Sequence, residues 1–63
     1  MITRNIRLIV ARHRKGYKQW ELAKEVGIHH KEYSKFESRN EKPSDEIQHR
    51  IAMKLGAKKE DLF

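Results

Sequence analysis

The chain has 63 residues and no cysteine, and its 15 Lys and Arg residues against 9 Asp and Glu give a formal net charge of +6. This length suits one small domain, residues 1–63, without disulfides or thiolate metal ligands, so packed secondary structure must stabilise it. No apolar run is long enough to span a membrane, and the N-terminal apolar stretch is too short for a secretory signal, so we expect a cytoplasmic protein.

The positive charge is concentrated at the start of the chain. Residues 1–20 contain six Lys and Arg residues and no acid, and Glu21 is the first carboxylate. Basic domains of this size often bind nucleic acid, although many are merely soluble. The charge therefore indicates a polyanionic partner without establishing one.

A first helix is predicted over residues 5–14. Asn5 or Thr3 can cap its start, and Gly16 after Lys15 can end it. Leu8 and Ala11 form its apolar stripe. Three more apolar residues lie partly beside the stripe: Ile6, Ile9 and Val10. They either widen the core face, which we favour, or stay exposed for a partner.

A second helix is predicted over residues 19–26, with apolar residues at helical spacing. Gly27 can take the positive φ of a helix-ending turn, and Ile28 can pack beneath that turn. Lys18 and Gln19 stand at the helix start, where backbone N–H groups favour an anion such as a DNA phosphate. We expect Trp20 to be partly buried rather than exposed near a nucleic-acid backbone.

A third helix, over about residues 29–37, carries the most informative face. Tyr33 and Phe36 are three apart and so share an apolar side. The other side offers four basic or hydrogen-bonding residues: His30, Lys31, Ser34 and Lys35. Such a face on a short helix after a tight turn suits the DNA major groove.

The rest of the chain predicts one more helix and a final turn. Pro43 and Ser44 mark a helix start after a polar loop, and the helix runs from residue 46 or 47 to residue 55. Its apolar stripe is Ile47, Ile51, Ala52 and Leu55. A last turn from residue 58 would pack Leu62 and Phe63 on the core. Since no strand pattern occurs, we predict an all-α bundle of four to five helices.

In order and spacing, these motifs resemble the lambda repressor-like helix-turn-helix family of the Cro/CI or Xre type. The resemblance covers almost the whole chain. The matching residues are Arg12, Gly16, Gln19, Glu21, Leu22, Ala23, Gly27, Ile28, Tyr33, Phe36, Glu37, Pro43, Ser44, Ile51, Ala52, Leu55, Gly56, Asp61, Leu62 and Phe63. It implies a compact helix-turn-helix bundle that binds double-stranded operator DNA, usually as a homodimer.

The resemblance also implies roles for individual positions. The residues expected to reach DNA bases are His30, Lys31, Ser34 and Lys35. Those expected to contact the DNA backbone are Lys18, Gln19, Ser38, Arg39, Asn40 and Lys42. Gln19 would also brace the first residues of the recognition helix. Arg12 and Glu37 match a structural ion pair.

Two departures from the family pattern concern the ends of the third helix. His29 replaces the usual small capping residue and is a poorer cap. Arg39 replaces a glycine, and arginine is costly at positive φ, so we expect the helix to run one residue longer and turn at Asn40. Glu32 could accept from cytosine, repel phosphate or pair with a neighbouring lysine, and simple solvation is the favoured interpretation.

Other functions fit the residues less well. The four histidines have no metal-ligand spacing, adjacent His29 and His30 should point to different sides of a helix, and no catalytic set is visible, so we expect no enzyme, metal or cofactor. The alternative is a protein-interaction module of antitoxin or anti-repressor type, with a partner on the first helix or C-terminal tail. Its surplus apolar residues would be Ile2, Ile6, Ile9 and Val10. The retained bases of the third helix favour a DNA-binding regulator, expected to be a repressor.

Overall fold

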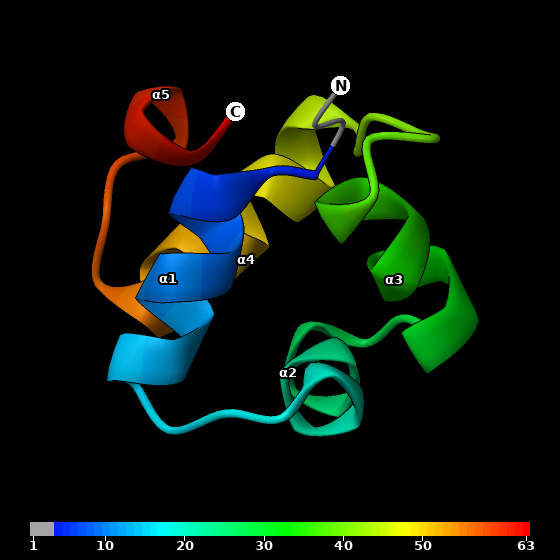
Figure 1. Cartoon of the computed structure of the whole chain (residues 1–63), viewed down its shortest axis with the longest axis horizontal. Helices are drawn as coiled ribbons and strands as arrows, with labels where there is room; N and C mark the ends of the chain where they lie inside the picture. The colour runs from blue at the N-terminus through cyan, green and yellow to red at the C-terminus, as the bar shows by residue number, and fades with distance from the viewer. Residues whose placement is uncertain (1–3) are drawn as a thin grey trace.

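Five helices follow one another along residues 4–63, the part of the chain that the computed structural model describes (Figure 1). They are α1 (Ile6–Arg14), α2 (Gln19–Val26), α3 (His30–Glu37), α4 (Asp45–Leu55) and α5 (Lys59–Leu62). No strand occurs in residues 4–63, so the all-α prediction is confirmed for this part of the chain. Ile2 and Thr3 lie outside the described residues.

Polar groups next to the first turn determine where the helices begin. The Asn5 side chain accepts a hydrogen bond from the Leu8 N–H group (3.1 Å), and Ser44 Oγ accepts one from the Ile47 N–H group (3.3 Å). At α2, the Glu21 carboxylate accepts from the backbone N–H of Lys18 (2.8 Å). These bonds satisfy N–H groups that have no partner within the helix. Ser44 starts α4 at residue 45, slightly earlier than the pattern predicted.

The turn after α2 brings α3 close behind it. Gly27 has φ +82°, and the N–H group of Ile28 donates to the carbonyl of Ala23 (3.0 Å). This is the Schellman arrangement, which needs a left-handed residue at the turn. Ile28 is half-buried against the core, as the sequence predicted. Only His29 then separates the turn from α3.

The turn after α3 has the same form without glycine. Arg39 has φ +62°, and the N–H group of Asn40 donates to the carbonyl of Lys35 (3.0 Å). The expectation that α3 would run on and turn at Asn40 is therefore wrong. Glu37 is buried and hydrogen-bonded to Arg12, which fixes it as the last residue of α3. The chain therefore turns two residues later, and the exposed Arg39 takes the left-handed conformation.

Replacing Arg39 by glycine should stabilise the protein. A left-handed conformation costs a non-glycine residue about 1–2 kcal/mol, part of which the greater backbone entropy of unfolded glycine offsets, so we expect a gain of about 1 kcal/mol. Urea unfolding followed by circular dichroism measures it. Asn40→Gly is the matched control and should destabilise or change nothing. A larger gain from Asn40→Gly would contradict the assignment of the turn to Arg39.

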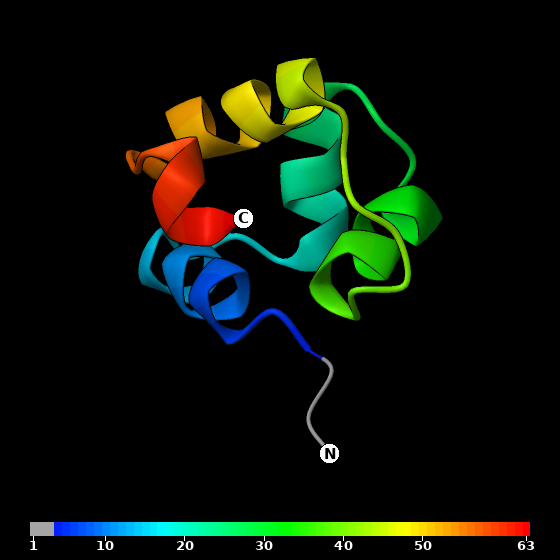
Figure 2. The ribbon, with the colours of Figure 1, turned by 90° about the horizontal axis from the view of Figure 1, so that it is seen from above.

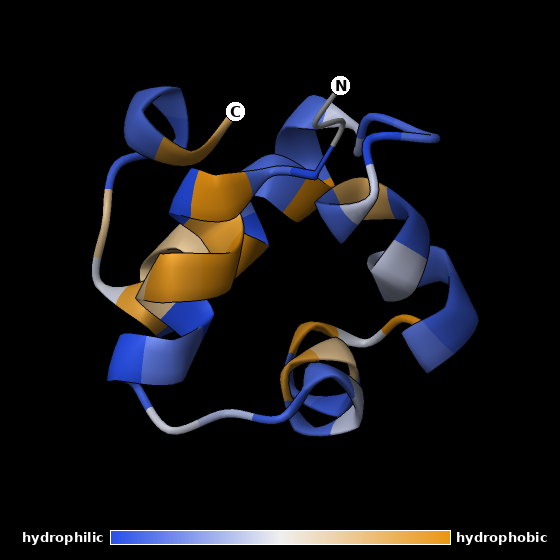
Figure 3. Cartoon of the chain, in the orientation of Figure 1, coloured by the Kyte–Doolittle hydropathy of each residue, from blue (hydrophilic) through white to orange (hydrophobic). Residues whose placement is uncertain are grey.

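All five helices contribute to one apolar core. Its buried side chains are Leu8, Leu22, Ala23, Val26, Tyr33, Phe36, Ile51, Ala52, Leu55 and Leu62. Figure 2 shows α5 next to α1 and α4, with the C-terminus directed inward, and half-buried Phe63 packs on the core as predicted. In Figure 3 the apolar colours gather on α1 and α4, whereas the outer end of α3 is hydrophilic. The described helices include none long and apolar enough to cross a membrane.

Three apolar side chains lie more open than the sequence predicted. Ile6 is 51% exposed and Val10 42% exposed, so they do not widen the core face of α1. Ile9 is half-buried. Trp20, for which we favoured partial burial, is 54% exposed at the start of α2. The other helices bury the side of α1 that carries Leu8, with Ala11 packed against the core beside it, whereas Ile6 and Val10 face solvent.

Asn5, near the N-terminus, is hydrogen-bonded both to the end of α3 and to the last turn of the chain. It is buried, its backbone N–H donates to the carbonyl of Glu37 (2.6 Å), and its side-chain amide donates to the carbonyl of Leu62 (2.7 Å). The residue that caps α1 therefore also fixes the end of α3 and the end of α5.

Candidate functional site

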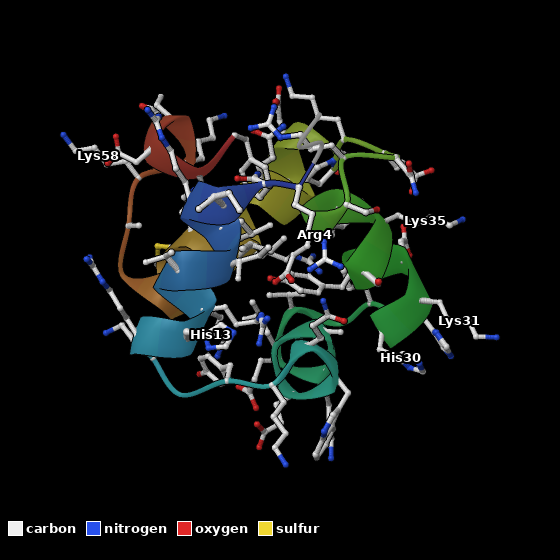
Figure 4. The ribbon with its side chains drawn as sticks, viewed as in Figure 1. Arg4, His13, His30, Lys31, Lys35 and Lys58 are labelled. Carbon is white, nitrogen blue, oxygen red and sulfur yellow. The ribbon has the colours of Figure 1, made fainter. Side chains whose placement is uncertain are left out.

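The outer face of α3 gathers the residues that the sequence singled out. His30, Lys31 and Lys35 are exposed and, in Figure 4, lie on the side of α3 that faces away from the bundle. Ser34 is half-buried beside them. On the inner side, Tyr33 and Phe36 are buried with their ring centroids 6.3 Å apart. Burial of the two aromatic rings thus fixes the rotation of α3 that presents its polar face.

The start of α3 depends on a histidine cap. His29 Nδ1 accepts a hydrogen bond from the backbone N–H of Lys31 (3.1 Å), so the imidazole does the work of the serine or threonine it replaces. The helix consequently begins at His30. The expectation that His29 and His30 point to different sides is wrong, because His29 precedes the helix and its ring stacks on that of His30 with centroids 4.6 Å apart.

The bases of α3 have no acidic partner within the described part of the chain. The ion pairs there are Arg12–Glu37, Arg50–Glu46, Lys54–Glu25 and Lys59–Asp45. Carboxylates thus neutralise bases of α4 and α5 but neither Lys31 nor Lys35. Glu32 pairs with neither lysine. Lys31 and Lys35, without ion pairs, are therefore available to an anionic ligand, although the exposed Glu32 lies on the same helix.

Most residues predicted to contact a DNA backbone flank this face. Lys18 lies at the start of α2, and the exposed Arg39, Asn40 and Lys42 follow α3. Ser38 is half-buried, and its hydroxyl donates to the carbonyl of Lys35 (3.1 Å). Because Gln19 at the start of α2 bonds to Glu37, Lys18 and the loop after α3 lie toward the same end of the polar face, where a ligand longer than α3 would reach them.

Gln19 is engaged differently from the role that the resemblance implied. Its side-chain amide donates to Oε1 of Glu37 (2.7 Å), the last residue of α3. The brace from α2 thus reaches the end of α3, and no described hydrogen bond of Gln19 reaches the first residues of that helix. One amide N–H and the side-chain carbonyl of Gln19 remain for an external ligand.

A buried network around Glu37 ties α1, α2 and α3 together. Arg12 Nε donates to Glu37 Oε2 (2.6 Å) and Arg12 Nη2 to Oε1 (3.3 Å), so the pair that the resemblance implied is present and bidentate. The Tyr33 hydroxyl donates to Oε2 as well (2.6 Å). Arg12 Nη1 donates to the carbonyl of Tyr17 (2.8 Å). With the bond from Gln19, no buried polar side-chain atom among the described residues lacks a partner.

The network shifts the ionisation of its members. Burial alone would raise the pKa of Glu37, but hydrogen bonds from Arg12, Tyr33 and Gln19 outweigh it and hold that pKa below its usual value. Burial and the adjacent Glu37 carboxylate raise the pKa of the Tyr33 hydroxyl. Burial alone would lower the pKa of Arg12. The hydrogen bond to Glu37 and its negative charge outweigh burial, so the pKa of Arg12 lies above its usual value. At neutral pH, Glu37 is therefore an anion and Tyr33 a donor.

Acid should weaken this network. Because the pKa of Glu37 is lower in the folded than in the unfolded chain, its stabilisation is complete above the unfolded value, near 4.5, and is lost as the pH falls through the folded value. Urea midpoints between pH 7 and pH 3 should fall more steeply for the natural protein than for Glu37→Gln. Trimethylamine N-oxide keeps the variant folded if required. Parallel curves for the two proteins would exclude a depressed pKa at Glu37.

A small polar hollow lies beside the network, between α1, α2 and α3. It measures about 130 Å³, and its lining is Arg4, Ile9, Gln19, Ser34, Glu37 and Ser38. Figure 4 shows Arg4 between α1 and α3. In the sequence Arg4 is only one of the six bases that precede Glu21, because nothing local marks a base before a helix cap as part of a site formed by three helices.

Comparison with known proteins adds nothing to this geometry, because no family model, curated protein or solved structure matches the chain. A functional assignment therefore depends on the side chains of residues 4–63 themselves. The feature that stands out among them is the unpaired basic face of α3, with Arg4, Lys18 and the loop after α3 around it.

Proposed function

We propose that this chain is a sequence-specific double-stranded DNA-binding transcriptional regulator in which α2 and α3 form a helix-turn-helix. The observation that carries the proposal is the outer face of α3, where exposed lysines lack acidic partners among the described residues while bases of α4 and α5 have them. The sequence resemblance to lambda repressor-like domains supports the same function.

In this proposal α3 enters the major groove as the recognition helix. Its 8 residues make a rod about 12 Å long, and its polar side faces outward. Lys31 and Lys35 are four residues apart, so they lie one above the other on that side and reach neighbouring base pairs. Each can donate to the O6 and N7 acceptors of guanine, and His30 can donate to a purine N7. Ser34 can donate or accept between them.

Phosphate contacts would hold the helix in place. In this arrangement Lys18 and Gln19 at the start of α2 meet the DNA backbone near the end of α3, and the loop residues Ser38, Arg39, Asn40 and Lys42 meet it beyond that same end. The position of Arg4 on the hollow beside Gln19 adds a phosphate ligand that the sequence pattern did not include. Such contacts supply most of the affinity but no sequence information.

One such helix reads only a few base pairs, so a two-fold operator bound by two copies is part of the proposal. Recognition helices of such a dimer lie about 34 Å apart, one turn of DNA. A dimer held over a promoter would exclude polymerase, which is why repression is proposed rather than activation.

Selection of bound sequences from random duplex DNA, at low and at physiological salt, tests the proposal. We expect an enriched motif with two-fold symmetry, retained at the higher salt. Lys31→Ala/Lys35→Ala should abolish the enrichment while leaving weak salt-sensitive binding. If the protein retained all random duplexes equally, it would bind DNA only through nonspecific attraction to phosphates. If it retained no DNA at low salt, DNA binding would be refuted.

A further inference from the structure

A second surface lies away from α3, in the groove between α1 and α5. Figure 1 shows these two helices on one side of the bundle and α3 on the other. The groove is a hollow of about 490 Å³ whose walls come from α1, the end of α4 and α5. No residue of the DNA-binding proposal lines it.

The floor and one wall of this groove are apolar. Ile6 and Val10 are four residues apart on α1, 51% and 42% exposed, and together form a ridge along the groove. Leu55 and Leu62 close the floor beneath them, and half-buried Ala57 continues it. Because α5 has only 4 residues, it covers part of α1 and leaves the ridge in solvent.

The rim of the same groove is basic. Arg7 and Arg14 are exposed, line the hollow, and have no ion pair among residues 4–63. Lys15 lies at one end, where its Nζ comes within 3.4 Å of the Cβ position that a side chain at Gly56 would occupy. Asp61 is the one acid in the lining. The groove thus combines apolar contact area with uncompensated positive charge.

From this combination we infer that the groove binds an acidic amphipathic helical segment of a partner protein. Apolar side chains at positions i and i+4 of that segment cover Ile6 and Val10. Carboxylates beside them pair with Arg7 and Arg14, which are seven residues apart and so lie two turns apart on the same side of α1. Apolar anchors with a charged rim are the usual anatomy of a helix held in a groove.

The charges argue against the other occupants of an apolar groove. A second copy docked through the same face would bring the unpaired Arg7 and Arg14 of both copies together, where like charges repel. DNA offers no apolar side chains for Ile6 and Val10. A lipid bilayer would cover the ridge of Ile6 and Val10 but would not fill the recessed floor at Leu55 and Leu62, which a single helix can.

The inference goes beyond DNA binding and is independent of it. A partner in this groove would leave α3 free, so one molecule can hold DNA and the partner together. An acidic segment at this site also keeps its negative charge on the side of the bundle away from the DNA. The groove would therefore recruit a regulator to bound DNA rather than displace the protein from it.

The test uses a synthetic peptide of about 15 residues, four helical turns, with leucine at i, i+4, i+7 and i+11 and glutamate at most other positions. It is titrated into isotopically labelled protein and followed by NMR of the Ile6 and Val10 methyl groups. We expect saturable shifts at these methyls with a Kd in the micromolar range. A peptide of the same composition in scrambled order should bind at least about tenfold more weakly.

Variants separate the groove from general attraction. Val10→Glu places an acid on the ridge and should weaken peptide binding at least about tenfold. Met53→Glu is the matched control, since Met53 is 69% exposed on α4 outside this groove, and it should leave the affinity unchanged. Val10→Glu and Met53→Glu change the net charge equally and should have the same DNA affinity, so that failure of one proposal is distinguishable from failure of the other.

Four results would overturn the inference. They are the absence of methyl shifts, shifts confined to the basic face of α3, stronger shifts at Ile6 and Val10 from anionic lipid vesicles than from the peptide, and concentration-dependent shifts at these residues in the protein alone. The last result would assign the groove to a second copy of the chain.

Discussion

Replacing Arg12 by alanine should remove most of the stability of the domain. The side chains of Arg12 and Glu37 are 10% and 5% exposed, and the substitution leaves a buried carboxylate without its bidentate partner. Breaking such a buried pair costs about 3–5 kcal/mol. A domain of this length has roughly 3–9 kcal/mol in total. We therefore expect the Tm to fall by more than about 10 °C, measured by circular dichroism.

An exposed ion pair provides the control for Arg12. Lys54 lies 3.2 Å from Glu25, but both side chains are nearly half exposed, so Lys54→Ala should cost less than about 1 kcal/mol. DNA affinity of the Arg12 variant, measured where it is still folded, should change little, because Arg12 faces the interior. A melting curve unchanged by Arg12→Ala would show that the network does not hold the helices together.

Replacing Lys31 by alanine should have the largest single effect on DNA recognition. The lysine is exposed on the outer face of α3, and its charge has no partner within the described residues. We expect a loss of about 1–3 kcal/mol on the selected operator together with relaxed preference at one base pair. Competition binding against operators that carry each base in turn measures both quantities.

Lys58 supplies the charge-matched control for Lys31. It is exposed next to α5, on the side of the molecule away from α3 in Figure 4. Lys58→Ala removes the same charge and should weaken binding to every sequence slightly, through the net charge alone. Equal loss from Lys31→Ala on all sequences would show that Lys31 contacts phosphate rather than a base.

Much of the fold follows from local signals in the sequence. Asn5 and Ser44 were recognisable as caps, Gly27 and Gly56 as helix ends, and Tyr33 with Phe36 as an inward face. In the structure each of them occupies that position. Such signals act within one helical turn, so they need no knowledge of the neighbouring helices.

The predictions that failed depend on distant partners. Arg39 adopts positive φ because Glu37 is anchored from α1 and α2, and no local propensity reports that anchor. Ile6 and Val10 belong to a helix whose buried side depends on its packing against α3 and the very short α5. His29 caps α3 through a ring nitrogen, a group that lists of preferred caps leave out.

The candidate site was predictable in part for the same reason. Helical geometry places His30, Lys31, Ser34 and Lys35 on one side of α3, and the sequence alone identifies that side. Whether their charges are neutralised depends on the positions of acids in the folded chain, and only the structure shows that the pairs of Glu46, Glu25 and Asp45 are with bases of α4 and α5. Arg4 and the true partner of Gln19 likewise emerge only from three helices together.

The hydrogen bond from Asn5 to Leu62 spans 57 positions of the chain and sets a time for folding in the cell. At about 5–20 residues per second, a ribosome that has made Asn5 needs about 3–11 s to reach Leu62. During that interval the helix-capping asparagine lacks one of its partners, and the apolar core lacks Leu62. In this incomplete state the nascent domain is most accessible to cleavage by proteases and to binding by chaperones. Its core is completed only after the last turn has been synthesised.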